Sequence, residues 1–172
     1  MALSMVLSIV PSRVLCMILS TVLFMTSCKE QTSTPTPVDP VGLGVGSRHA
    51  GGVVFSVQTD SAGRKHGLVA SASDLSGNAD WLTAKRQCQE YRGGGYDDWY
   101  LPSKGELKTL FDNRVQVNAA LLNVVGTGPV QGVVWSSTEF SSASAYRFSF
   151  TTGLDAIYIK DGRHDVRAVR RF

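Results

Sequence analysis

Cysteine is scarce in this chain, and its distribution restricts the chemistry that the protein can carry out. Of the three cysteines, Cys16 and Cys28 fall in or at the end of an N-terminal apolar leader, and Cys88 lies alone in the body of the sequence. If the leader is removed and Cys28 is modified, as argued below, no pair of thiols remains for an internal disulfide. The three histidines also lack the spacing of metal ligands, so we predict no metal site and no cofactor.

A large excess of charge of one sign is absent as well. The chain has 17 basic and 14 acidic residues, a formal net charge of +3. Loss of a leader in which Arg13 is the one charged residue lowers this value to +2. Nucleic-acid-binding domains carry a basic stripe or patch, so we predict no nucleic-acid partner.

Long polar side chains are missing from one segment near the end of the chain. Between Phe140 and Asp165 there is no Glu, Gln, Met or Trp, and the one lysine is Lys160. Ordinary solvated surfaces are rich in Lys, Glu and Gln. Tyr, Phe, Arg, Ser and Asp are present instead, and side chains of these types form the contact surfaces of binding proteins. We therefore predict that this segment displays a contact surface.

The N-terminal leader resembles the signal peptide of a bacterial lipoprotein. Its apolar run, Val14 to Met25, is too short to span a membrane as a helix. The following residues, Thr26-Ser27-Cys28, resemble a lipobox, in which the cysteine thiol receives a diacylglycerol. We predict a signal peptide over residues 1–28 and attachment of the mature chain to the bacterial cell envelope, exposed on the outer membrane, through lipid on Cys28. The alternative is an ordinary secretory signal with an incidental cysteine.

A polar segment rich in Pro, Thr and Gly follows the leader. Residues 29–49 have little to bury, so we predict a tether between the anchor and a domain over residues 50–172. The glycine-rich stretch 42–46 follows no strand and opens no helix, so we assign it to the tether.

Local patterns predict helices and strands in this domain. A β-hairpin is expected over residues 51–57 and 66–70, and an amphipathic helix over 79–92 with Cys88 on its apolar stripe. Ser103 and Glu106 form a capping box before a second helix, residues 104–113. Further strands are expected over 130–136, 145–151, 154–160 and 166–172, the last two joined by a hairpin turn at 161–162.

The expected strand 145–151 has two different faces. Tyr146, Phe148 and Phe150 alternate with Arg147, Ser149 and Thr151. We expect the aromatic set to pack inward and the polar set to be free to meet a partner.

Several motifs in this order resemble the DUF1566, or Lcl C-terminal domain, family. They are found at residues 51–55, 65–70, 98–107, 134–139 and 166–172. The resemblance implies an α+β, C-type-lectin-like fold, with two helices packed on a twisted antiparallel sheet and with the N- and C-terminal strands paired. The positions that match the family are also expected to form a scaffold: Trp99, Leu101, Pro102, Leu107, Trp135, Ser136, Ser137, Glu139, Gly153, Val166, Arg167, Val169, Arg170 and Phe172. In this scaffold the hydroxyl groups and Glu139 are expected to form hydrogen bonds with backbone groups in irregular segments. Arg167 and Arg170 brace the sheet in this interpretation, and a sulfate or heparin site is the alternative.

Similar domains are targets of diversity-generating retroelements, which randomise adenines in Asn codons. Such changes cannot produce Lys, Glu, Gln, Met or Trp, the residues that Phe140 to Asp165 lacks apart from Lys160. The alternative is a fixed sheet whose sequence happens to avoid long polar side chains.

Calcium-dependent lectins use Glu-Pro-Asn, Gln-Pro-Asp or Trp-Asn-Asp motifs, and none occurs here. Asp97 and Asp98 are a pair of loop carboxylates of the kind that is usually solvated. A lone cysteine on an apolar stripe also disfavours an enzyme of the formylglycine-generating type.

We therefore predict a non-enzymatic, surface-displayed adhesin or receptor whose partner is a protein or glycan at a cell surface. A structural envelope or appendage component is the alternative, and the sequence sets neither the ligand nor the oligomeric state. The predicted contact residues are Phe140, Ser141, Ala143, Ser144, Tyr146, Arg147, Ser149, Leu154, Asp155, Ile157, Tyr158, Asp161, Arg163 and His164.

Overall fold

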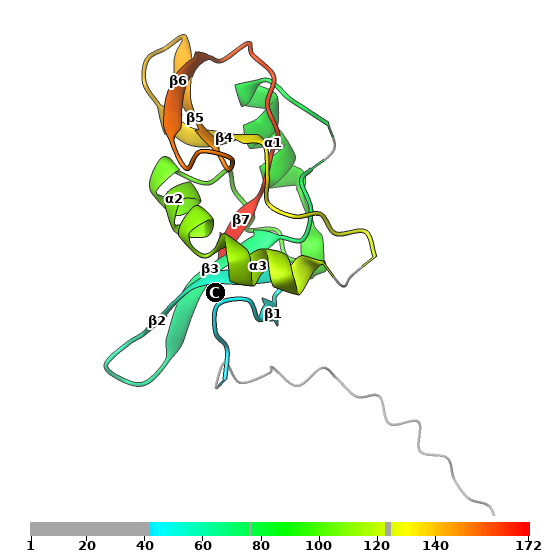
Figure 1. Cartoon of the computed structure of the whole chain (residues 1–172), viewed down its shortest axis with the longest axis vertical. Helices are drawn as coiled ribbons and strands as arrows, with labels where there is room; N and C mark the ends of the chain where they lie inside the picture. The colour runs from blue at the N-terminus through cyan, green and yellow to red at the C-terminus, as the bar shows by residue number, and fades with distance from the viewer. Residues whose placement is uncertain (1–41, 76, 123–124) are drawn as a thin grey trace, which may run out of the picture. The chain divides into compact units, whose positions relative to one another are not determined.

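A computed structural model describes residues 42–75, 77–122 and 125–172 (Figure 1). The predicted signal peptide, Cys28 and the tether as far as residue 41 lie outside these residues. The described part contains three α-helices and two antiparallel sheets, so the α+β class is confirmed. No helix in this part is long and apolar enough to cross a membrane.

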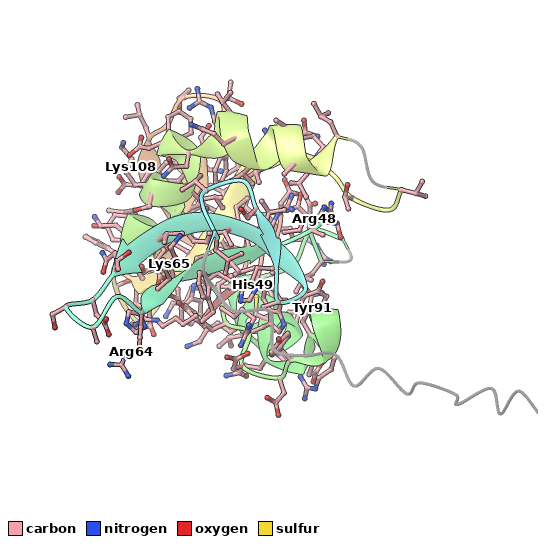
Figure 2. All side chains as sticks on the ribbon, turned by 90° about the horizontal axis from the view of Figure 1, so that it is seen from below. Arg48, His49, Arg64, Lys65, Tyr91 and Lys108 are labelled. Carbon is pink, nitrogen blue, oxygen red and sulfur yellow. The ribbon has the colours of Figure 1, made fainter. Side chains whose placement is uncertain are left out.

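The first sheet is built around the predicted β-hairpin, which is confirmed. Its order is β1 (Arg48–His49), β2 (Gly52–Thr59), β3 (Lys65–Ser71) and β7 (Val169–Arg171). At the turn between β2 and β3, the Asp60 carboxylate accepts hydrogen bonds from the backbone N–H groups of Ala62 and Arg64. Figure 2 shows the Arg64 side chain pointing away from the domain at this end of the hairpin.

The folded domain reaches back into the segment expected to be tether. Gly46 donates its N–H to the carbonyl of Val54, and Val54 donates its N–H to the carbonyl of Ser47. β1 then pairs with β2. Residues 46–49 therefore extend the first sheet at its β1 edge.

The second sheet contains three of the predicted strands. They are β4 (Val133–Glu139), β5 (Ser144–Ser149) and β6 (Asp155–Ile159), in that order, with β6 at the edge (Figure 1). The turn between β5 and β6 contains Gly153, whose φ of +74° is favourable for glycine. In this sheet Tyr146 lies opposite Ile157, and Ala145 lies opposite Tyr158.

The terminal strand is not the partner of β6, so the hairpin predicted at residues 161–162 is wrong. Gly162 closes a turn by donating its N–H to the carbonyl of Ile159, but the chain then leaves this sheet and β7 pairs with β3. The expected direct pairing of the N- and C-terminal strands is also wrong. The first predicted strand is β2, and β3 lies between β2 and β7. Residues 166–169 are all buried, so this segment belongs in the interior rather than beside the exposed strand β6.

The two predicted helices are confirmed. α1 (Trp81–Glu90) is capped by Asp80 and buries Trp81, Ala84 and Cys88. α2 (Lys104–Asp112) begins at Ser103 with the complete capping box, because the Ser103 hydroxyl accepts the Glu106 N–H and the Glu106 carboxylate accepts the Ser103 N–H.

A third helix, α3 (Arg114–Leu121), corrects the expected number of two. It buries Val117 and Leu121, which are one turn apart. Val115 and Leu122 are 70% and 73% exposed, so apolar residues lie on several sides of this helix. Such a distribution hides the amphipathic pattern that marks a helix in a sequence.

The hydrophobic core lies on both faces of the sheets. One cluster joins α2 and α3 to Val134 and Phe148, and the other joins α1 to Trp135 and Ala145. Successive residues of a strand point to opposite faces, so β4 and β5 are packed on both sides. The expectation of a single inward face on β5 is therefore incomplete, since Ala145 is buried on the face that also carries Arg147.

Candidate ligand-binding surface

The predicted contact residues are all at least partly exposed. The buried positions between Phe140 and Asp165 are Ala145, Phe148 and Phe150, and none of them belongs to the predicted set. Many of the scaffold positions are buried instead, and Trp99, Leu101, Leu107, Trp135, Val166, Arg167 and Val169 are 0–3% exposed. Four others are not buried: Glu139 is exposed, and Ser137, Gly153 and Phe172 are partly exposed.

Strand β6 is exposed along its whole length. Ile157, Tyr158 and Ile159 retain 45%, 38% and 59% of their accessible surface. Ile157 and Ile159 point to one face of the strand and Tyr158 to the other, so β6 exposes apolar surface on both of its faces. Exposed apolar surface of this kind is found at binding sites. Backbone hydrogen bonds to β5 hold the strand in place.

The structure divides the predicted contact residues between the two faces of the sheet. We call one face the Tyr146 side, where Tyr146, Ile157 and Asp155 lie together. The Lys104 ammonium lies 4.2 Å from the centre of the Tyr146 ring and 3.5 Å from the Asp155 carboxylate. The Phe140 ring contacts Tyr146 edge to face. Tyr146, expected to point inward, is only half-buried, because Lys104 at the start of α2 covers it rather than the apolar core.

We call the opposite face the Arg147 side. There the Arg147 guanidinium stacks on the Tyr158 ring at 4.2 Å, and Arg147 Nη1 lies 3.2 Å from His164 Nε2. The His164 ring contacts Tyr158 and also the buried Trp135, with ring centres 4.9 and 4.8 Å apart. Arg147, which the sequence predicted to be free, is thus held by two other members of the predicted contact set.

His164 acts in this cluster as a neutral acceptor. Burial lowers the pKa of His164 from its ordinary value, and the neighbouring Arg147 charge lowers it further, while Asp165 has the opposite effect. Arginine has only donors, so Nε2 of His164 accepts the proton of Nη1. The cluster therefore carries the positive charge of Arg147 at neutral pH.

A shallow hollow adjoins the cluster. Its volume is about 340 Å³, and its lining includes Val133, Arg147, Ser149, Thr152 and Leu154. The Leu154 side chain is 68% exposed. The hollow combines the Arg147 cation with aliphatic side chains, two hydroxyl residues and Asp155.

The turns before β5 and after β6 carry the remaining predicted residues, and they lie at the same end of the sheet. The Ser141 hydroxyl accepts the N–H groups of Ala143 and Ser144 in the turn before β5. After β6, Asp161 is exposed, and Arg163 donates from Nε and Nη2 to the carbonyl of Asn78. These turns extend the surface beyond the sheet.

Lys160 is a structural residue that sequence reasoning missed. Its side chain is 14% exposed, and its ammonium lies 2.6 Å from the Glu139 carboxylate, 3.0 Å from the carbonyl of Ser142 and 4.4 Å from the centre of the Trp81 ring. The ammonium also lowers the pKa of Glu139. Glu139, expected to satisfy irregular backbone, binds Lys160 instead. A single lysine in a segment that otherwise lacks long polar side chains was the signal for this role.

Comparison with known families agrees with the sequence motifs. A model of the Lcl C-terminal domain family matches residues 57–170, which is most of the described domain. The chain belongs to the Lcl C-terminal domain family. Among curated proteins, none matches the chain significantly.

The scaffold of this Lcl C-terminal domain includes Arg167, which is fully buried. Arg167 Nε donates to the Asp74 carboxylate at 2.7 Å, and its terminal nitrogens donate to the carbonyls of Ser71, Gly128 and Pro129. A buried guanidinium with these partners is out of reach of a sulfate group. The contacts agree with the bracing role rather than with a heparin site.

Arg170 makes a more exposed brace in the Lcl C-terminal domain. Its Nε and Nη2 lie 2.6 and 3.0 Å from the two oxygens of Asp98, and it stacks on Tyr96. Arg170 also lowers the pKa of Asp98. Asp98 is therefore an ion-pair partner, and across the described ranges no three His, Cys, Asp or Glu side chains are arranged to hold a metal ion.

Proposed function

We propose that this Lcl C-terminal domain protein binds a protein or glycan ligand at a cell surface through β5, β6 and their flanking turns. The observation that carries the proposal is the separation of roles within one segment. On β5, partly exposed side chains flank the buried residues Ala145 and Phe148, which anchor the strand, and the side chains of β6 are all exposed. A rigid backbone with exposed aromatic and short polar side chains gives contact area at low entropic cost.

Binding to a panel of purified surface proteins and glycans tests this function. The full chain, coated on beads, is compared with an Ile157→Ala/Tyr158→Ala variant. A matched control is Val115→Ala/Leu122→Ala, which removes exposed apolar groups at α3. We expect saturable binding that weakens at least tenfold in the first variant and not in the control. No binding to any panel member, or equal losses in both variants, contradicts the proposal.

We also propose that the domain has a C-type-lectin-like fold and that a retroelement diversifies its accessible surface. Lys160 supports this extension, because the one lysine in the segment has a structural role and is not part of the displayed set. Sister copies of the gene are expected to differ at the exposed positions and to keep Lys160 and Glu139. Substitutions spread evenly over buried and exposed positions would instead indicate a fixed adhesin.

The lipid anchor would place this surface at the bacterial envelope. Support comes from the lipobox-like residues before Cys28, followed by a polar tether. Cys28→Ser is expected to abolish palmitate labelling and to release the protein from membranes. A variant that is still processed and membrane-bound would exclude the lipobox.

The alternative of a structural envelope component is favoured by one observation, the open edge of β6. Ser149 and Lys160 donate their N–H groups to the carbonyls of Leu154 and Ala143, respectively. By the alternation of an antiparallel ladder, Asp155 and Ile157 direct their backbone groups away from β5. A strand from a sister subunit would pair there. Sedimentation of the full chain distinguishes the two functions, because only the structural component requires self-association.

A further inference from the structure

Arg147 differs from several other arginines of the domain in its electrostatic partners. The guanidinium groups of Arg64, Arg167, Arg170 and Arg171 each lie within 4 Å of a carboxylate. Within residues 42–75, 77–122 and 125–172, Arg147 has no such partner, and its one hydrogen bond goes to His164 Nε2. A guanidinium has five N–H donors in a planar fork. The fork edge formed by Nε and Nη2 of Arg147 is therefore available to a ligand.

The guanidinium is already held in place before any ligand arrives. It is stacked on Tyr158 at 4.2 Å and bonded to His164, whose ring packs against the buried Trp135. Arginine loses much side-chain freedom when it is fixed by a ligand. Here the fold has fixed it, so binding loses little further entropy.

The wall of the hollow next to Arg147 is partly aliphatic. Val133, Leu154 and Ala156 line this hollow of about 340 Å³, together with Ser149, Thr152 and Asp155. The Asp155 carboxylate lies 3.5 Å from the Lys104 ammonium, which balances its negative charge. The Ser149 hydroxyl oxygen accepts the N–H of Thr152, which leaves the hydroxyl proton available for donation. The site thus offers a charged fork, one hydroxyl donor and a wall for a short apolar group.

We propose that this hollow binds a carboxylate of a peptide, with an adjacent aliphatic side chain placed against Leu154. The proposal rests on the proposed ligand-binding function and names the chemical class of the ligand. A carboxylate matches the Nε–Nη2 edge with two parallel, charge-assisted hydrogen bonds. Its aliphatic neighbour removes part of the Leu154 surface from water.

A sugar carboxylate fits the same hollow less well. A sugar ring commonly needs an open aromatic face, but Arg147 covers one face of Tyr158 and the indole of Trp135 is buried. The walls that remain contain aliphatic and short polar side chains but no aromatic ring. The geometry therefore favours a peptide over an acidic glycan.

The experiment is a titration of the full chain, followed by ¹⁵N NMR, with three small probes. N-acetyl-leucine carries the peptide carboxylate and an aliphatic side chain. N-acetyl-leucinamide has a neutral amide in place of that carboxylate, and glucuronate carries a carboxylate on a sugar ring. The Arg147 Nε–Hε resonance is assigned by its loss in Arg147→Gln. We expect N-acetyl-leucine to shift this resonance and to bind at least tenfold more tightly than either other probe. Arg147→Gln and Arg147→Lys are expected to weaken the binding of N-acetyl-leucine at least tenfold, because neither side chain presents the planar fork of N–H donors.

Three outcomes overturn the proposal. Equal binding of the amide excludes a carboxylate site, equal or tighter binding of glucuronate excludes the preference for peptides, and unchanged binding in Arg147→Gln excludes this arginine. The backbone spectrum of each variant shows whether it is folded. A failure here leaves the panel experiment with Ile157→Ala/Tyr158→Ala intact, so loss of this ligand class and loss of the binding function are distinguished.

Discussion

Replacement of Arg167 by methionine removes the central brace of the domain without opening a large cavity. The fully buried guanidinium connects Asp74 with the carbonyls of Ser71, Gly128 and Pro129. Removing one partner of a buried ion pair costs about 3–5 kcal/mol, because the other partner stays behind without compensation. The Asp74 side chain is 31% exposed, so water offsets part of this loss, and we expect a destabilisation of about 3 kcal/mol.

Urea unfolding of the full chain and of Arg167→Met measures this difference. Arg64→Met is the matched control, because the Arg64 side chain is 75% exposed and its loss is expected to change stability by less than about 0.5 kcal/mol. Asp74→Asn in the Arg167→Met background removes the uncompensated charge and is expected to recover about 1 kcal/mol or more. A loss below about 1 kcal/mol for Arg167→Met would show that Arg167 is not a brace.

The pH dependence follows from the same carboxyl group. Burial raises the pKa of Asp74 above its ordinary value, and the Arg167 charge opposes this effect. Removing Arg167 therefore raises the pKa of Asp74 further. A carboxyl group whose pKa is higher in the folded than in the unfolded state takes up protons on folding, so falling pH favours folding. The destabilisation by Arg167→Met is expected to be smaller at pH 5 than at pH 8, and the opposite trend would refute this reasoning.

Three further predictions concern single residues. Trp135→Ala, which removes a fully buried indole, is expected to cost about 3–5 kcal/mol in urea unfolding, whereas Arg147→Ala changes the melting temperature little. Burial raises the pKa of the Cys88 thiol to about 12, so Ellman's reagent is expected to label it at pH 8 only after unfolding. Backbone hydrogen bonding, first from Arg64, lowers the pKa of Asp60 to about 2, and a carboxyl ¹³C titration measures this pKa. The contribution of Asp60 to stability is therefore expected to be lost as the pH falls toward 2.

The elements that the sequence predicted well are those with local signals. The Ser103 capping box and the spacing of Trp81, Ala84 and Cys88 are complete within a few residues, so α1 and α2 follow from the sequence alone. The same holds for the hairpin of β2 and β3, whose turn is closed by Asp60 within five residues of chain. The predicted contact residues are at least partly exposed, although Tyr146 was also expected to point inward.

The features that sequence reasoning missed depend on distant partners. α3 is stabilised by burial of Val117 and Leu121 against the core, and its remaining apolar residues obscure that pattern. The terminal strand pairs with β3 because residues 166–169 are buried, although the Asp-Gly turn indicated β6 as its partner. The division of the contact surface into two sides depends on which face each core cluster covers. Strand alternation alone cannot show that both faces of β5 are packed.

This two-sided packing predicts that substitutions on β6 leave the fold intact. β5 is fixed by Phe148 on one face and Ala145 on the other, and β6 is held to β5 by backbone hydrogen bonds that do not depend on side-chain identity. Substitutions at exposed sites away from such anchors usually change stability by less than about 0.5 kcal/mol. Lys160 then fixes the chain at the end of β6 through Glu139 and Ser142. Under the proposed function, stability and ligand contact would thus depend on different residues of one segment, which is the physical requirement for a surface that meets new ligands on an unchanged backbone.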